Sequence, residues 1–111
     1  MKAFDYKLGM LFGSWDPLHA GHIRIITKAQ ALCEDIIIIA DTDDYIRKTK
    51  KREPYFPIQE RAWDLFAIKG VDCVEYEDDI FTKRYWVKVF KPDVLIKGDD
   101  WKGKHWSGEG L

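Results

Sequence analysis

Two histidines, His19 and His22, are the residues whose types and spacing point most directly to chemistry. They stand in GSWDPLHAGH, residues 13–22, where an apolar run gives way to a helical pattern. Residues three apart are neighbours on a helix, and a helix start offers N–H groups to an anion. Imidazoles there could donate to phosphate oxygens and stabilise charge on a phosphoryl group during transfer. The alternative is that one histidine caps the helix and the other is solvated.

The elements that must position these histidines follow from the hydrophobic pattern. The apolar run at 8–13 is typical of a buried strand. The β-branched run Ile36–Ile39 has no alternation, which indicates a strand covered on both faces, as in a parallel sheet. Polar and basic residues at 41–57 predict a mobile loop after a short helical turn. The predicted strands are 8–13, 35–41, 71–76 and 93–98, and the predicted helices are 20–33, 58–69 and 82–91.

This β-α-β-α-β-α-β order predicts right-handed crossovers and a doubly wound α/β parallel sheet in a single domain over residues 1–111. No internal repeat or linker divides the chain. In such sheets ligands bind at the carboxyl ends of the strands, near the point where strand order reverses. The histidines follow the first strand and the turn GDDW follows the last, so we expect the two segments to converge on one site.

Length and composition exclude several classes of protein. The chain has 111 residues, a net charge of −1, and 46% hydrophobic and 33% charged residues, which is ordinary for a globular domain. Nucleic-acid binding needs a basic excess that is lacking here. Cys33 and Cys73 are too few for a disulfide framework and are predicted to be reduced core residues. No apolar run has the length of a membrane span, so we expect a cytoplasmic protein.

The segment GSWDPLHAGH resembles the G-(S/T)-F-D-x-x-H-x-G-H signature of the nucleotidyltransferase (cytidylyltransferase-like) superfamily, with Trp15 in place of phenylalanine. ADTDDY and REPYFPIQERAWDL resemble the family's segments after the second strand, and KPDVLIKGDDW resembles its fourth strand and following loop. The GDDW loop is particularly similar to that of bacterial glycerol-3-phosphate cytidylyltransferases. The resemblance covers nearly the whole chain and implies a Rossmann-like fold.

The resemblance also implies an enzyme of the EC 2.7.7 type, in which a phosphate monoester attacks the α-phosphate of a nucleoside triphosphate. It assigns catalysis to His19, His22 and Lys51, and acceptor binding to Lys83 and Lys69. It assigns nucleotide binding to Gly13, Ser14, Trp15, Asp16, Ala20, Gly21, Lys50, Arg61, Gly98, Asp99, Asp100 and Trp101. For the basic run 47–52 the alternative is a solvated loop, and for Asp99 and Asp100 it is a strand-end turn.

Three functions compete on this basis. The first is transfer of CMP from CTP to a small phosphate monoester such as glycerol 3-phosphate, with release of pyrophosphate. The second is an adenylyltransferase of the heptose-phosphate type that uses ATP, which KPDVLIKG and REPYFPIQER also resemble. The third is a nucleotide-binding module that has lost catalysis. Mg²⁺ is expected to arrive with the triphosphate and not in a protein metal site; no nucleic-acid or membrane partner is expected.

One departure from the family is the main argument for the third function, a module that has lost catalysis. Its members carry an R-x-x-G-I-S-(S/T)-(S/T) segment after the GDDW loop, and this sequence has none. We therefore expect a domain that is shortened at its C-terminus. The sheet edge left unpaired would favour self-association, in the simplest case as a homodimer.

Overall fold

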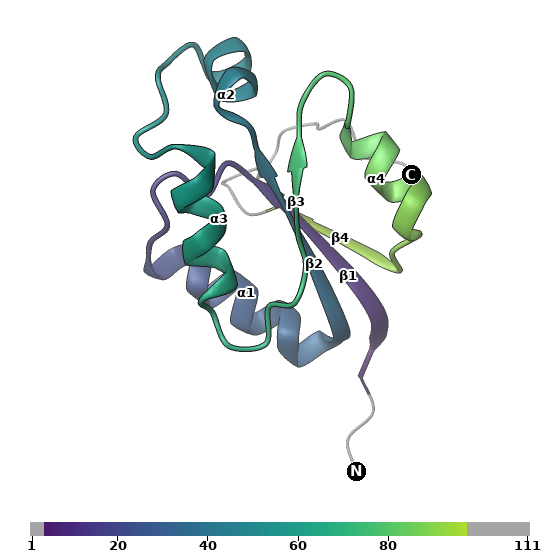
Figure 1. The fold of residues 1–111 in the computed structure, drawn as a ribbon. Coiled ribbons are helices and arrows are strands. Elements are labelled where there is room, and N and C mark those ends of the chain that lie inside the picture. Colours follow the sequence, from purple (N-terminus) through teal and green to yellow (C-terminus); the bar gives the residue numbers. More distant parts are fainter. Residues whose placement is uncertain (1–3, 98–111) are drawn as a thin grey trace.

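The computed structural model describes residues 4–97, in which four strands alternate with helices (Figure 1). No helix in this range is long and apolar enough to cross a membrane. The elements are β1 (Tyr6–Gly13), α1 (Ala20–Leu32), β2 (Cys33–Asp41), α2 (Asp43–Lys50), α3 (Ile58–Phe66), β3 (Val74–Glu77), α4 (Lys83–Phe90) and β4 (Val94–Lys97).

The four strands form one parallel sheet in the order β3-β2-β1-β4. The chain moves outward from β1 to β3 and then returns to the other side of β1, so strand order reverses between β1 and β4. In register, Phe12 of β1 stands beside Ile39 of β2 and Lys97 of β4. The predicted doubly wound α/β domain with a Rossmann-like parallel sheet is confirmed.

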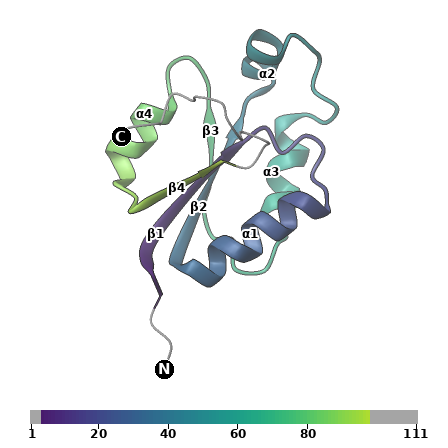
Figure 2. The ribbon, with the colours of Figure 1, turned by 180° about the vertical axis from the view of Figure 1, so that it is seen from behind.

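Helices cover the two faces of the sheet unequally. α1 and α3 lie together on one face and α4 on the other, as both ribbon views show (Figure 2). On the first face, strand residues such as Leu11 and Ile38 pack against Ile26 of α1 and Leu65 of α3. On the second face, Met10, Phe12, Ile37 and Ile39 pack against Trp86, Val87 and Phe90. Both faces of β1 and β2 are buried, as the isoleucine run predicts.

The largest difference from the sequence-based expectation is α2, because an eight-residue helix occupies about half of the segment 41–57, where a short helical turn and a mobile loop are predicted. The Thr42 hydroxyl caps this helix by accepting from the Tyr45 N–H at 3.3 Å. Asp43 and Asp44 lie in its first turn and three basic residues in its last turn, so both ends complement the helix dipole. These local signals stabilise a helix despite its very polar composition.

Candidate functional site

The histidine pair lies at the first turn of α1, at the carboxyl edge of the sheet. His19 is the N-cap residue, and its Nδ1 accepts a hydrogen bond from the Gly21 N–H at 3.0 Å. In return, Nδ1 of His22 accepts from the His19 N–H at 3.2 Å. The two rings lie 3.9 Å apart between centroids, tilted by 30°. Both histidines therefore cap the helix reciprocally, and the alternative of one capping and one solvated histidine is wrong.

This capping arrangement also determines which ring nitrogen carries the proton. A neutral imidazole has one donor and one acceptor nitrogen, and in both rings Nδ1 is the acceptor. The proton of each neutral ring therefore lies on Nε2, so each ring has an N–H donor on the side away from the cap. His19 is exposed, and His22 is only 5% exposed.

Gly21 has a different role from the one expected. A Cβ at Gly21 would come within 2.8 Å of the His19 ring, so the glycine makes room for the capping imidazole. The Gly21 N–H, expected to receive phosphate, donates to His19 instead. Its neighbour Ala20 is exposed at the helix start. The Gly21 N–H is thus engaged in the helix cap, and phosphate binding at this helix start stays a prediction.

Trp15 packs beneath the histidines instead of presenting its ring to a nucleotide. Its side chain is fully buried, and its indole N–H donates to the Ile39 carbonyl at 3.0 Å. Its ring centroid lies 5.1 Å from that of His22. Its φ of 55° is in the left-handed region, an unfavourable conformation for a bulky residue that is typical of functional loops. The Trp15 ring is thus part of the core, and a nucleotide contact by the rest of this residue stays a prediction.

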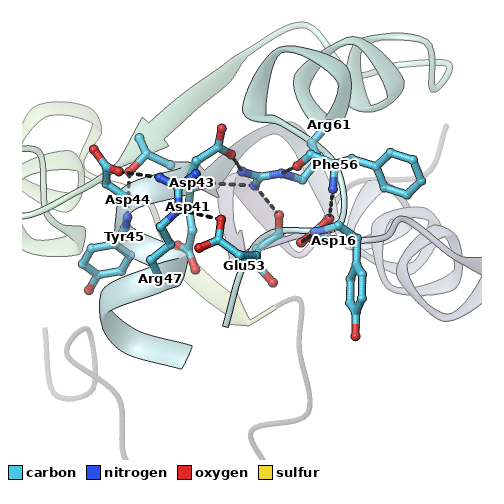
Figure 3. Close-up of polar contacts among 12 residues, drawn as sticks. Asp16, Asp41, Asp43, Asp44, Tyr45, Arg47, Glu53, Phe56 and Arg61 are labelled. Carbon is cyan, nitrogen blue, oxygen red and sulfur yellow. Dashed lines mark hydrogen bonds and ion pairs between the residues drawn. The ribbon is translucent and has the colours of Figure 1, made fainter. Parts of the chain in front are cut away.

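Asp16 is also buried, and it joins two loops. Its carboxylate accepts from the Tyr55 N–H at 2.7 Å, the Phe56 N–H at 2.9 Å and Nη1 of Arg52 at 3.0 Å. Figure 3 shows the contact between Asp16 and Phe56. The loop between β1 and α1 is thereby tied to the segment that precedes α3. Asp16 is therefore positioned to stabilise the conformation of this loop, and both of its carboxylate oxygens accept hydrogen bonds from the protein.

Arg61 of α3 is a second buried residue that contacts the loop between β1 and α1. It is 1% exposed, and its guanidinium donates to the carbonyls of Phe56 at 2.8 Å, Ser14 at 2.8 Å and Asp41 at 2.6 Å. It also pairs with Asp43 at 2.6 Å (Figure 3). Arg61 thus fixes the ends of β1 and β2 relative to α2 and α3. The contacts of Arg61 in this structure support a positioning role, and its expected contact with the nucleotide stays a prediction.

A polar pocket of about 230 Å³ lies at the carboxyl ends of β1, β2 and β4. Gly13, Asp41 and Lys97 are the last residues of these strands, and all three line it. Gly13 and Lys97 place the pocket at the point where strand order reverses. The other lining residues are Phe12, Tyr45, Thr49, Lys50 and Lys83.

Glu77, the last residue of β3, is the centre of a buried polar cluster beside this pocket. It is 1% exposed, and its two oxygens accept from Nζ of Lys83 at 2.7 and 2.8 Å. Asp41 and Tyr45 also hydrogen-bond to Glu77. Burial, followed by the charge of Glu77, raises the pKa of Asp41 to about 7 and the pKa of Tyr45 to about 12. Asp41 therefore keeps its proton up to about neutral pH.

The raised pKa of Asp41 predicts how stability depends on pH. Between about pH 4 and about pH 7 the folded chain keeps a proton that the unfolded chain has released, so the free energy of unfolding falls as pH rises through this window. Asp41→Asn, which mimics the protonated carboxyl, should flatten that decline. Urea unfolding of both proteins at about pH 5 and about pH 8 measures it. Equal pH dependence in the two proteins would contradict the assignment.

The structure separates Lys50 and Lys51, the two candidate site residues of the basic run 47–52. Lys50 lines the pocket at the end of α2, whereas Lys51 follows the helix with a φ of 57° and is exposed. The placement favours Lys50 over Lys51 as the residue that faces a ligand. Ser14 is buried and has the main-chain contact with Arg61 described above. Gly98, Asp99, Asp100 and Trp101 lie outside the described residues.

Lys83 and Lys69, both expected to bind the acceptor, lie at opposite edges of the sheet. Lys83 lines the pocket at the carboxyl edge. Lys69 borders a different hollow beside Cys33, the first residue of β2, and its carbonyl accepts from Gln30 at 2.8 Å. The structure thus places Lys69 away from the edge where the histidines lie, and the acceptor role expected of it stays a prediction.

Sequence reasoning missed four residues that the structure brings to the site: Asp41, Tyr45, Glu77 and Lys97. A usable signal was present for three of them, because Asp41, Glu77 and Lys97 each end a parallel strand, where ligands of such sheets bind. Among residues 4–97, no three His, Cys, Asp or Glu side chains gather in a group that could hold a metal ion.

Comparison with known proteins identifies the class of protein that this fold and site define. The model of the cytidylyltransferase-like family matches residues 10–108. A glycerol-3-phosphate cytidylyltransferase of Staphylococcus aureus is 31% identical over 98 residues, which cover 88% of this chain and 74% of that protein. The chain belongs to the cytidylyltransferase-like family of nucleotidyltransferases.

Other relatives carry a different name. The bifunctional protein HldE of Caulobacter vibrioides is 36% identical over 103 residues, which cover 90% of this chain and 21% of that protein. The chain thus spans about a fifth of the HldE relatives it matches. The crystal structure of a lipopolysaccharide core biosynthesis protein from Thermoplasma volcanium has the same fold, with a TM-score of 0.72 and 23% identity over 81% of this chain and 72% of that chain.

Proposed function

We propose that the chain transfers an adenylyl group from ATP to a phosphorylated sugar of the heptose-phosphate type. Membership of the nucleotidyltransferase family supports the reaction class, and relatives named HldE support this substrate pair over CTP with glycerol phosphate. The single structural observation that supports the transfer reaction is that the capped histidine pair and the lysine-lined pocket lie at the same edge of the sheet.

The geometry suits a one-step transfer. A phosphate oxygen of the acceptor attacks the α-phosphorus of the nucleotide and forms the new O–P bond. The bond from that phosphorus to the β-phosphate oxygen breaks, and pyrophosphate leaves with the electron pair. The Nε2–H groups of His19 and His22 would donate to phosphate oxygens as charge develops on them. Positioning and charge stabilisation perform the catalysis, so no protein nucleophile is required.

Mg²⁺ enters this proposal as part of the substrate. Asp41 and Glu77 are the buried carboxyl pair closest to the pocket, and they are engaged with each other and with Lys83. This donor set suits a cation of the protein better than a metal ion. We therefore propose that Mg²⁺ arrives on the triphosphate, held by phosphate oxygens and water.

CTP and glycerol 3-phosphate form the second candidate pair. It is favoured by the relative from Staphylococcus aureus, of which the chain covers 74%, and by the sequence GDDW at 98–101. The two candidates share the histidine pair and differ in the nucleotide base and the acceptor.

Pyrophosphate release distinguishes the candidates when ATP and CTP are each combined with a heptose 1-phosphate and with glycerol 3-phosphate. We expect release with ATP and the heptose phosphate. Release only with CTP and glycerol 3-phosphate would establish the second candidate instead. Calorimetry with each nucleotide accompanies the assay, since binding without turnover would indicate a nucleotide-binding module. A chain that shows no nucleotide binding and no turnover would overturn the proposal.

A further inference from the structure

The outer side of α3 presents two large aromatic side chains to solvent. Trp63 is 78% exposed and Phe66 is 51% exposed, and residues three apart are neighbours on a helix. The buried residues of α3 are Arg61, Ala62 and Leu65, so Trp63 lies on the side of the helix that faces away from the sheet. Adjacent exposed aromatic side chains of this kind are typical of surfaces that bind another protein.

The neighbouring helix α1 has an open hollow on its own outer side. The hollow has a volume of about 730 Å³, and its described lining residues all belong to α1. They include Ile23, Thr27 and Ala31 between the stems of Arg24 and Lys28. Both helices cover the same face of the sheet, so the hollow and the aromatic pair belong to one helical layer (Figure 1, Figure 2). Together they form the α1/α3 surface, whose residues are those of the hollow and the exposed residues of α3.

The two halves of the α1/α3 surface carry opposite charges. In α1 the charged residues are Arg24 and Lys28, both exposed, and the helix contains no acidic residue. In α3 the exposed charged residues are Glu60 and Asp64, because the arginine of this helix is buried. Within residues 4–97 none of these four exposed groups takes part in an ion pair. Each helix therefore presents the charge that the other would attract.

A second copy of the chain fits both halves of this surface at once. In a two-fold dimer the same patch of both copies meets, so each contact occurs twice. When the axis runs between α1 and α3, parallel to the helical layer, α1 of each copy lies on α3 of the other. The two cations of α1 then face the two carboxylates of α3 at both contacts. Packing of α1 on α1 would instead place like charges against each other.

The aromatic group and the hollow also lie at similar heights along their helices. Both helices begin at the carboxyl edge of the sheet, and each helical residue adds about 1.5 Å. Trp63 is the sixth residue of α3, whereas Arg24 and Thr27 are the fifth and eighth residues of α1. A two-fold axis along the helices preserves these heights. It therefore brings Trp63 of one copy over the hollow of the other.

We propose that the chain forms a two-fold symmetric homodimer through the α1/α3 surface, in which Trp63 of each copy occupies the α1 hollow of the other copy. The contact is made by helical side chains, whereas the self-association expected from the sequence rests on an unpaired sheet edge. The inference goes beyond the proposed function, because Trp63 and the four charged residues take no part in the proposed transfer.

Sedimentation equilibrium of the full chain over a range of concentrations tests the dimer. We expect a monomer–dimer equilibrium with a Kd of about 1–100 µM, as for a small interface. Trp63→Ala should weaken the dimer by about tenfold or more, since buried tryptophans dominate many interfaces. Ile80→Ala is the matched control: Ile80 is 76% exposed but lies between β3 and α4, so the Kd should not change. A wild-type chain that stays monomeric throughout, or a Trp63 variant that dimerises unchanged, would overturn the proposal.

Charge reversal tests which two surfaces meet. One variant carries Arg24→Glu and Lys28→Glu, and the other carries Glu60→Lys and Asp64→Lys. Each alone should dimerise about tenfold or more weakly, because like charges then meet at both contacts. An equimolar mixture should dimerise about as tightly as the wild type, because every α1 then faces an α3 of opposite charge. All four positions are exposed, so both variants should fold.

The mixing result distinguishes this dimer from other modes of association. Dimers of either variant alone that are as tight as the wild type would place the contact elsewhere and overturn the proposal. A mixture that stays as weakly associated as its components would do the same. Association of the wild type into rings or filaments would contradict the two-fold arrangement, because only an isologous contact closes at two copies.

Discussion

His19→Asn is expected to lower turnover by about 10²–10³-fold while leaving the melting temperature nearly unchanged. Asparagine is among the best N-cap residues, and its side-chain oxygen can accept from the Gly21 N–H as Nδ1 of His19 does. It cannot supply the Nε2–H donor that we propose acts on a phosphate oxygen. The substitution therefore separates the two roles that the structure combines in one imidazole. Steady-state pyrophosphate release and thermal unfolding measure them.

His19→Ala is the matched control for this prediction. It should lose the same turnover and, in addition, about 1 kcal/mol of stability, because alanine supplies no capping acceptor. The two variants then differ in stability and agree in activity. Full turnover in a folded His19→Asn protein would show that this histidine is only a helix cap.

The fold could be predicted because its signals are local and repeat along the chain. The isoleucine run of β2 is buried on both faces, and this pattern alone indicates a parallel sheet. The position of α2 could not be obtained from hydrophobic periodicity, since Ile46 is its only buried residue. Its helix is determined by the Thr42 cap and by charges matched to the dipole, which a search for apolar stripes does not detect.

The candidate site was only partly predictable, for a physical reason. The histidine motif lies in one contiguous segment, whereas the Asp41–Glu77–Lys83 cluster is assembled from three elements and exists only in the folded chain. Trp15, Asp16 and Arg61 carry residue types that suit ligand binding, but the structure satisfies their polar groups internally. The sequence shows that such groups are present, but it does not show which partners they hydrogen-bond in the folded chain.

Arg61→Met is expected to lower the free energy of unfolding by about 3–5 kcal/mol. The substitution removes a buried guanidinium that donates to three carbonyl groups and pairs with Asp43. The carbonyls of Ser14 and Asp41 lie in the buried interior and would lose this donor. Methionine replaces most of the apolar volume, so the loss reports the polar contacts more than a cavity. Urea unfolding monitored by circular dichroism measures it.

Arg47→Met is the control, because Arg47 is an arginine with acidic partners that lies on the surface. It pairs with Asp44 at 2.6 Å and Glu53 at 2.9 Å, and both partners are exposed. Exposed pairs of this kind contribute about 0–1 kcal/mol, so the change should stay within that range. Both variants lose an arginine that is paired with carboxylates, so the contrast reports the burial of Arg61 together with its three carbonyl contacts. An equally small loss of unfolding free energy in Arg61→Met and Arg47→Met would contradict the prediction. The buried guanidinium would then not be what holds the ends of β1 and β2 against α3. The carboxylate of Asp16 would instead have to fix the loop that carries Trp15 and Asp16.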